Sequence, residues 1–318
     1  MITPKPATGR LLCVGLTTVD VVALAVQLER FEGVRLMGAM QMAPAGTAAG
    51  AALVAARLGV STQLLGTVGA DAMGRFVCNE LAFAGVDVSL VKVIPCKATS
   101  ATLIPIDPAG ERMIYHAPGA APFIEITPQD RAAATQARAV HYAAVGAVMS
   151  EREAGVELLR AAKQGGAMVT CDLIAPGPLA AAELKRILPY VDVFLPSAVE
   201  ARYLTGQDDL HCAAQAFITW GASACVIKNG AQGAHAVDSQ GRVDQIAAIP
   251  VKELIDTTSC GDGFCAGFIA ARMRGRPWLE ALNFAAATAS LVAQGPATVG
   301  GLNSSEQVDA LLLEGPVA

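Results

Sequence analysis

Residues 256–263 read DTTSCGDG and continue as FCAGF over residues 264–268. A strand-like apolar run over residues 246–255 precedes the first Asp, and an apolar helix is expected to begin near Cys260. Small residues at a helix start leave backbone N–H groups accessible, and the positive end of the helix dipole lies there, so an anion is stabilised. Asp262 brings a carboxylate into this cradle, as expected of a residue that takes a proton. The stretch therefore predicts phosphoryl transfer to a hydroxyl, with the backbone holding the charge and Asp262 activating the nucleophile.

The glycines of this stretch allow other interpretations. The chain has no G-x-x-x-x-G-K-[ST] loop, and the spacing of Gly261, Gly263 and Gly267 differs from a dinucleotide-binding fingerprint. We expect Gly263 and Gly267 to serve close helix packing. Chemistry is the better explanation for Gly261 with Asp262, because the string D-T-T-x-x-G-D goes well beyond what a helix cap requires.

The composition narrows the class of protein. A chain of 318 residues suits one α/β domain with a small appendage. The net charge of −5 gives no electrostatic footprint for nucleic acid, and no apolar run is long enough to span a membrane. Eight cysteines without a C-x-x-C pair indicate free thiols in a reducing compartment, and four scattered histidines do not suggest a zinc site. We therefore expect a soluble, cytoplasmic protein.

Short apolar runs alternate with helical patterns along the chain. This alternation predicts an α/β fold with a mainly parallel sheet covered by helices on both faces. The expected strands are 11–16, 63–68, 139–145, 168–172, 193–195 and 224–228, and the expected helices are 47–58, 74–84, 151–164, 179–188, 213–220, 260–274, 278–293 and 305–313.

Two segments interrupt the alternation. Residues 101–107 and 112–116 are extended runs joined by the turn signal PAGE, which predicts a β-hairpin. Residues 34–42 are also apolar and non-helical. Together these segments predict a small separate sheet that projects from the main domain as a lid. We expect Arg112, in the hairpin, to face solvent.

Residues 256–269 resemble the C-terminal signature of the PfkB (ribokinase-like) carbohydrate kinases, D-T-T-x-A-G-D, with Cys260 at the Ala position. The resemblance implies that Asp262 is the catalytic base, and that backbone N–H groups for the transferring phosphoryl group come from Ser259, Cys260, Gly261 and Asp262. In several members the first Asp and the second Thr line a monovalent-cation site. By this resemblance Asp256 and Thr258 are candidates to bind potassium.

The N-terminal part is similar to the signature that lines the sugar site in this family. Residues 45–50 read AGTAAG, and the similarity continues through residues 55–59 and 66–74. The resemblance implies that Asp20 and Gly46 contact the acceptor. Gly50 stands at the usual Asn position, and Thr47 stands where fructose-directed members have another Asn. Losing two amide side chains removes groups that read hydroxyl positions, so the substrate is not specified.

The nucleotide half resembles the family less closely. Residues 197–200 read SAVE where the family has N-x-x-E, whose Glu helps to organise the magnesium–water shell. Glu200 is therefore a candidate for Mg²⁺ through water. Ser197 replaces the Asn, and two readings stay open for it: a nucleotide-site residue, or the N-cap of a capping box.

Residues 228–233 read KNGAQG and resemble the family's nucleotide-contacting T-x-G-x-x-G turn. Lys228 takes the Thr position, either as a point charge for a phosphate or as a solvated lysine at the end of a strand. Gly230 and Gly233 either contact the nucleotide or only form the turn. Asn283 and Ala286 fall in the helix that covers adenine in relatives.

The sequence thus predicts one ribokinase-like domain over residues 1–318, with lid segments near 17–45 and 96–118. The expected activity is transfer of the ATP γ-phosphoryl group, with Mg²⁺, to a hydroxyl of a sugar or sugar-like small molecule. A nucleoside kinase of the same fold is the first alternative, and a non-catalytic binding protein that kept the fold is the second. In relatives the lid often forms the dimer contact, so a homodimer is expected.

Overall fold

Strands and helices alternate along the chain in the computed structural model, which describes residues 9–24, 26, 37–107, 112–146 and 152–314. The strands are β1 Leu11–Gly15, β2 Thr18–Leu24, β3 Ala39–Ala45, β4 Thr62–Gly69, β5 Val86–Ile94, β6 Ala101–Pro105, β7 Tyr115–Ala117, β8 Ala139–Val145, β9 Met168–Leu173, β10 Val193–Phe194, β11 Ala224–Lys228, β12 Ala234–Asp238 and β13 Val243–Ile246. The helices are α1 Thr47–Arg57, α2 Ala72–Phe83, α3 Pro128–Gln136, α4 Arg152–Gln164, α5 Ala180–Ile187, α6 Ala198–Thr205, α7 Leu210–Thr219, α8 Cys260–Met273, α9 Trp278–Val292 and α10 Ser305–Glu314, with short 3-10 turns η1 Leu188–Tyr190 and η2 Gly230–Gln232.

The main sheet of the described residues has the order β13-β12-β11-β10-β9-β8-β1-β4-β5. Neighbouring strands are parallel from β11 to β5, whereas β12 is antiparallel to both β11 and β13. The carboxyl ends of the parallel strands therefore lie along one edge, where open α/β sheets bind ligands.

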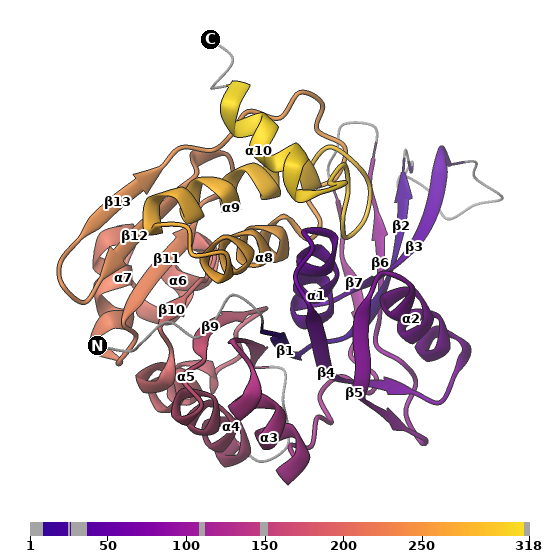
Figure 1. Ribbon diagram of the computed structural model, residues 1–318. Coiled ribbons are helices and arrows are strands. Elements are labelled where there is room, and N and C mark those ends of the chain that lie inside the picture. The colour runs from indigo at the N-terminus through magenta and orange to yellow at the C-terminus, as the bar shows by residue number, and fades with distance from the viewer. Residues whose placement is uncertain (1–8, 25, 27–36, 108–111, 147–151, 315–318) are drawn as a thin grey trace.

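Helices cover both faces of this sheet, as the alternation predicted. Along β11, Ala224 and Val226 join the core under α1, α2, α8 and α9, while Cys225 and Ile227 join the core under α3 to α7. Successive side chains of a strand point to opposite faces, so one apolar strand supplies both cores. Figure 1 shows α1, α8 and α9 together on one side of the sheet, with α3, α4 and α5 on the other.

Glycine gives α8 and α9 their close approach. A Cβ at Gly267 would lie 2.6 Å from Thr288 Oγ1, and a Cβ at Gly263 would lie 3.0 Å from Val292 Cγ2. Both glycines therefore serve packing, as the sequence predicted. The close contact fixes the position of the first turn of α8.

A second, four-stranded sheet has the order β3-β2-β6-β7 and stands beside α1 and α2 (Figure 1). β6 and β7 pair antiparallel, as the predicted hairpin requires, although its turn at 108–111 and residues 34–36 lie outside the described residues. This small sheet is joined to the C-terminal part of the chain, because Thr298 Oγ1 donates to the Pro44 carbonyl at 2.5 Å.

The apolar run over residues 246–255 is not a strand beyond Ile246, so that part of the prediction is wrong. Pro250 cannot donate a ladder hydrogen bond. The backbone N–H groups of Ile255 and Asp256 instead donate to the Ala293 carbonyl at 3.0 and 3.3 Å. The segment thus crosses from the sheet edge to the end of α9 before α8 begins.

None of the helices in the described part of the chain is both long and apolar enough to cross a bilayer.

Candidate active site

The predicted anion cradle corresponds to the first turn of α8. Ser259 precedes the helix in the left-handed conformation, with φ of 58°, and its side chain makes no cap hydrogen bond. This conformation is strained for a residue other than glycine, and such strain concentrates at functional sites. The N–H groups of the first turn have no acceptor within the helix. The Cys260 N–H also lies 3.4 Å from the Thr257 carbonyl oxygen, a long contact that leaves the start of the helix suited to an anion.

Asp262 lies in this turn with partial access to solvent. Its pKa is raised to about 7, chiefly by burial and further by the Asp172 carboxylate, while the Lys228 ammonium opposes the rise. A Cβ at Gly50 of α1 would lie 2.8 Å from Asp262 Oδ2. The glycine at the usual Asn position therefore leaves the space that the Asp262 carboxylate occupies.

Asp20 extends into the site from β2 and is only 6% exposed. Its Oδ1 is buried, with no hydrogen-bond partner among the described residues. Burial raises the pKa of Asp20 to about 6, although Thr102 hydrogen-bonds to it. Thr102 pairs with Asp20 across β2 and β6, and its Oγ1 lies 3.1 Å from His116 Nδ1 on β7. Thr102 and His116 thus extend the polar row that begins at Asp20.

The other predicted acceptor-site residues lie at the start of α1. Gly46 has φ of 98°, and a Cβ there would lie 2.6 Å from the Leu16 carbonyl oxygen, so a side chain is excluded. Thr47 is buried, and its Oγ1 donates to the Ala143 carbonyl at 2.8 Å. The Thr47 hydroxyl is therefore already engaged with the end of β8.

Lys228 ends β11 in a buried ion pair with Asp172, which the sequence analysis missed. Lys228 Nζ lies 2.6 Å from Asp172 Oδ2, and the two side chains are 13% and 3% exposed. The pKa of Lys228 is raised, because the carboxylate of Asp172 outweighs the effect of burial. Cys265 Sγ on α8 also lies 3.2 Å from Asp172 Oδ2. The reading of Lys228 as a solvated lysine is wrong, and its ammonium lies 3.4 Å from the position of a Cβ at Gly261.

Ser197 and Glu200 form the capping box of α6. Ser197 donates to Glu200 Oε2 from its N–H and its Oγ, both at 2.7 Å, and Ser197 Oγ accepts from the Glu200 N–H at 3.3 Å. The capping interpretation of Ser197 is confirmed. The pKa of Glu200 is raised by burial and by the neighbouring Asp172 carboxylate. The Asp172 carboxylate therefore lies close enough to disfavour the charged form of Glu200.

The turn after β11 has the predicted glycine geometry. Gly230 and Gly233 have φ of 55° and 82°, and the Asn229 N–H donates to the Gly233 carbonyl at 2.7 Å. A Cβ at Gly233 would collide with the Ile246 carbonyl of β13. Both glycines are thus required by the turn itself.

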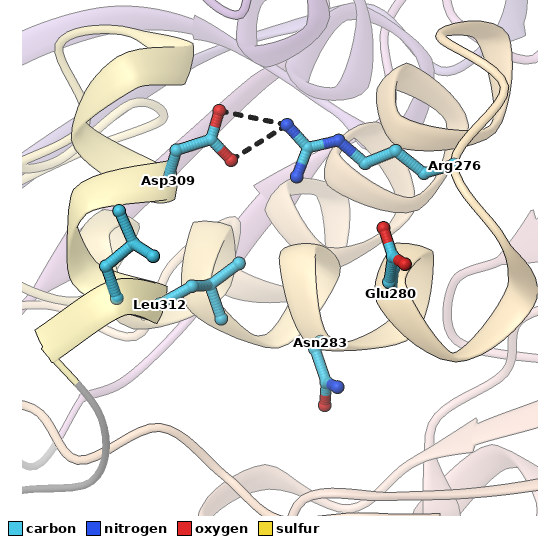
Figure 2. Close-up of a pocket in the computed structure, with 6 residues that line it drawn as sticks. Arg276, Glu280, Asn283, Asp309 and Leu312 are labelled. Carbon is cyan, nitrogen blue, oxygen red and sulfur yellow. Dashed lines mark hydrogen bonds and ion pairs between the residues drawn. The ribbon is translucent and has the colours of Figure 1, made fainter.

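The two α9 candidates lie in different surroundings. Ala286 is buried against α8. Asn283 lines a pocket of about 470 Å³ with residues of α9 and α10. Figure 2 shows Arg276 and Asp309 of this pocket pointing toward each other, with the Asn283 amide directed away from them. The structure thus places Asn283 among residues of the α9–α10 surface, and Ala286 in the core.

Arg112 is exposed, as predicted, but its guanidinium also contacts the segment that leads into α8. Arg112 Nη1 donates to Thr258 Oγ1 at 3.2 Å and lies 3.9 Å from Asp256 Oδ1. Asp256 and Thr258 are themselves buried, immediately before the cradle. This contact could not be predicted from local sequence patterns, because Arg112 and Thr258 are 146 positions apart.

A model of the pfkB family carbohydrate kinases matches residues 8–304. Among curated proteins, a ribokinase of Haemophilus influenzae is 29% identical over 262 residues, covering 79% of this chain and 81% of that protein. A fructokinase of Klebsiella pneumoniae is 27% identical over 241 residues, covering 73% and 78%. A cytidine kinase of Thermococcus kodakarensis is 37% identical over 99 residues, covering 30% and 35%.

Solved structures with the same fold include Arabidopsis thaliana ribokinase complexed with ribose and ATP. It has a TM-score of 0.82 and 23% identity, covering 96% of this chain and 98% of that chain. A candidate ribokinase II from E. coli in complex with ATP and Mg²⁺ also has a TM-score of 0.82, with 22% identity and coverage of 96% and 100%. The predicted ribokinase-like fold, with its large sheet and separate small sheet, is confirmed.

Proposed function

Because the chain belongs to the pfkB family of carbohydrate kinases, it is an ATP-dependent kinase for a hydroxyl of a sugar or sugar-like molecule, and we propose residue roles for that reaction. Asp262 takes the proton from the acceptor hydroxyl. The acceptor oxygen then attacks the γ-phosphorus of ATP. The bond between the γ-phosphorus and the oxygen that bridges it to the β-phosphate breaks, and ADP leaves. A carboxylate with pKa of about 7 suits this task, because a base works best when its pKa lies near the working pH.

The cradle at Ser259, Cys260, Gly261 and Asp262 holds the transferring phosphoryl group in this proposal. Backbone N–H groups at a helix start stabilise negative charge and are already oriented before the reaction begins. The support is the left-handed Ser259 and the first turn of α8, which the packing of Gly263 and Gly267 fixes in place.

The observation that carries the proposal is the unpartnered buried oxygen of Asp20. A buried carboxylate oxygen without a donor is costly, so a donor from a bound molecule stabilises it. A hydroxyl of the acceptor is such a donor. Gly46 allows the chain to pass close to the Leu16 carbonyl, and Thr47 and Gly50 complete the acceptor side through backbone groups, since the Thr47 hydroxyl is bound to Ala143 and Gly50 has no side chain.

We place the nucleotide at the carboxyl ends of β10 and β11, beside Ser197, Lys228, Gly230 and Gly233. α9, which carries Asn283 and Ala286, would lie on the adenine side, with Ala286 supporting it from the core. Lys228 can approach a phosphate, since its ammonium lies under Gly261 of the cradle. Asn283 itself lines the α9–α10 pocket.

Mg²⁺ fits the oxygen donors beside this nucleotide site. Glu200 would hold it through water, and the raised pKa of Glu200, from burial and the Asp172 carboxylate, supports a site that a cation would stabilise. When bound, the metal would supply positive charge that stabilises the negative charge developing on the phosphates. By resemblance, Asp256 and Thr258 are the candidates for a potassium site, and the Arg112 guanidinium contacts Thr258 Oγ1 and lies near Asp256 Oδ1.

A screen of ATP consumption over hexoses, pentoses, sugar phosphates and nucleosides tests the proposal. We expect turnover with at least one sugar-type acceptor, and loss of that turnover in Asp20→Asn with unchanged ATP binding. Turnover only with nucleosides would favour the nucleoside kinase, for which the similarity to a cytidine kinase is the specific support. Absence of turnover with every acceptor would favour the non-catalytic binding protein.

We also propose a homodimer through the small sheet. Val21, Met42, Leu103 and Tyr115 form one cross-strand row, on the face opposite Asp20 and Thr102. Met42, Leu103 and Tyr115 are 41%, 46% and 51% exposed. An exposed apolar row of this kind fits a protein interface. We also propose a cytoplasmic location, because that compartment supplies ATP and keeps thiols reduced, and the eight cysteines of the chain are free.

A further inference from the structure

Arg112 joins the small sheet to the segment that leads into the cradle. Its backbone is held by an antiparallel bridge to Ile106, just beyond β6. Its guanidinium reaches Thr258 Oγ1 at 3.2 Å and lies 3.9 Å from Asp256 Oδ1. A residue of the hairpin thus contacts the two side chains that the resemblance assigns to a monovalent cation.

Asp256 already has hydrogen-bond donors for both carboxylate oxygens. Oδ1 accepts from the Thr258 N–H at 2.8 Å, and Oδ2 accepts from the Ala297 N–H at 3.0 Å. The residue is only 2% exposed, so its charge is screened little by water. These neutral donors do not cancel its charge, and without a nearby positive charge a buried carboxylate beside an anion cradle would repel the incoming phosphoryl group.

The same two oxygens do not suit a guanidinium and a metal ion together. Thr258 Oγ1 accepts from Arg112 Nη1, and Asp256 Oδ1 faces both the Thr258 N–H and the guanidinium. A potassium ion at these oxygens would have to displace the guanidinium. Arginine stays charged at every working pH, so the charge that it supplies is permanent.

We propose that Arg112 is a positioning residue that supplies, from the small sheet, the positive charge that a monovalent cation supplies in relatives. The chain then needs no potassium at Asp256 and Thr258. This inference rests on the proposed function of the neighbouring cradle.

The field of Arg112 reaches into the cradle itself. Burial raises the pKa of the Cys260 thiol to about 12, with Asp256 adding to the rise and Arg112 opposing it. The two charges therefore act on the same cradle residue with opposite sign. Without Arg112, the negative field of Asp256 would act on the cradle alone.

The test compares wild type with Arg112→Ala and Arg112→Lys, in KCl or in choline chloride of equal concentration. Arg131→Ala is the matched control, because the Arg131 side chain is 33% exposed against 34% for Arg112 and also contacts a carboxylate, Glu157, at 3.4 Å. Two quantities are measured in each salt: ATP consumption with the acceptor found by the screen, and the melting temperature of the protein without nucleotide.

We expect wild type and Arg131→Ala to behave alike in the two salts. In choline chloride, turnover by Arg112→Ala should fall about 10- to 100-fold. This loss is no larger than the loss caused by removing one hydrogen-bond donor that contacts a transition state directly. In KCl, the turnover of the variant should recover. Its melting temperature should rise in KCl, because the vacated oxygens accept the ion. Arg112→Lys should retain much of the turnover in choline, since it keeps the charge without the planar fork.

A wild type that requires potassium, or an Arg112→Ala variant as active in choline as wild type, would overturn the inference. The melting temperatures decide independently of turnover: a potassium-dependent rise in wild type equal to that in Arg112→Ala, or no rise in Arg112→Ala, also overturns it. If no acceptor supports turnover, the proposed function fails, and the melting temperatures still decide the role of Arg112.

Discussion

Asp262 and Gly50 lie so close together that one carbon atom added at position 50 would contact the Asp262 carboxylate. Any side chain at position 50 would press against this carboxylate, because its Cβ would lie 2.8 Å from Asp262 Oδ2. Burial and Asp172 together bring its pKa to about 7. The departure from the family pattern at position 50 thus bears on the position of the base as well as on the acceptor.

Gly50→Ala should lower kcat by at least about tenfold, because a displacement of the base by about 1 Å can reduce the rate 100-fold. Steady-state kinetics with the acceptor found by the screen measures this effect. Gly177→Ala is the matched control, since a Cβ there meets nothing within 4 Å. Unchanged kcat in Gly50→Ala would show that the position of the Asp262 carboxylate is unimportant.

Asp262→Asn should raise the melting temperature at pH 8. The folded-state pKa of about 7 lies above the ordinary value of 3.8, so ionised Asp262 destabilises the folded state. The penalty is complete above pH 7, shrinks as pH falls toward 4, and amounts to at most about 4 kcal/mol for such a shift. Melting curves at pH 8 and pH 5 check the sign, and a variant less stable than wild type at pH 8 would contradict it.

Local motifs explain which site residues could be predicted from the sequence. Asp262 and Ser259 share one turn of the chain, so their proximity follows from the helix start alone. Asp172 and Lys228 are 56 positions apart, and only the order of β9, β10 and β11 brings them together. The position of Asp172 at the carboxyl edge of a parallel sheet was an available signal.

At the scale of elements, β9 and β11 present one buried ion pair to the first turns of α8. Asp172 is the penultimate residue of β9, Lys228 ends β11, and Cys265 of α8 lies against the same carboxylate. Strand and helix alternation predicted these elements, because buried parallel strands are continuous apolar runs. The same criterion failed for residues 247–255, where the apolar residues cover the end of α9 without forming a strand ladder.

Lys228→Met should destabilise the protein by about 3–5 kcal/mol, because it leaves the buried Asp172 carboxylate without its partner. Urea unfolding at pH 7.5 measures the loss, and adding Asp172→Asn should recover part of it. Lys163→Met is the control: its ion pair with Asp192 is 29% and 32% exposed, so the loss should be about 1 kcal/mol or less. Equal losses in the two lysine variants would show that the buried pair with Asp172 contributes no more to stability than the partly exposed pair with Asp192.

At the scale of the whole molecule, the small sheet has two different faces. The inner face presents Asp20 and Thr102 to the site, and the outer face presents Leu103 and its apolar row. Because side chains alternate along a strand, one sheet can bind the acceptor and form a subunit contact. The sequence predicted the sheet from its hairpin, whereas the link from Arg112 to Thr258 follows only from the folded chain.

Leu103→Glu should convert the proposed dimer to a monomer, because it places a charge in the middle of the apolar row. Light scattering after size-exclusion chromatography measures the mass against 32.5 kDa for one chain. Phe83→Glu is the control, since Phe83 is 91% exposed at the end of α2, outside the row. A wild type that is monomeric at micromolar concentration, or a Leu103→Glu variant that stays dimeric, would contradict the interface.

The most direct test of the central claim is the pH dependence of kcat/KM for wild type and Asp262→Asn, with ATP affinity measured on both. Wild-type kcat/KM should rise about tenfold per pH unit below pH 7 and level off above it, since Asp262 must be ionised to take the proton. Asp262→Asn should lose about 100- to 10,000-fold and bind ATP as before. A variant that keeps both the rate and the wild-type pH profile would contradict Asp262 as the base.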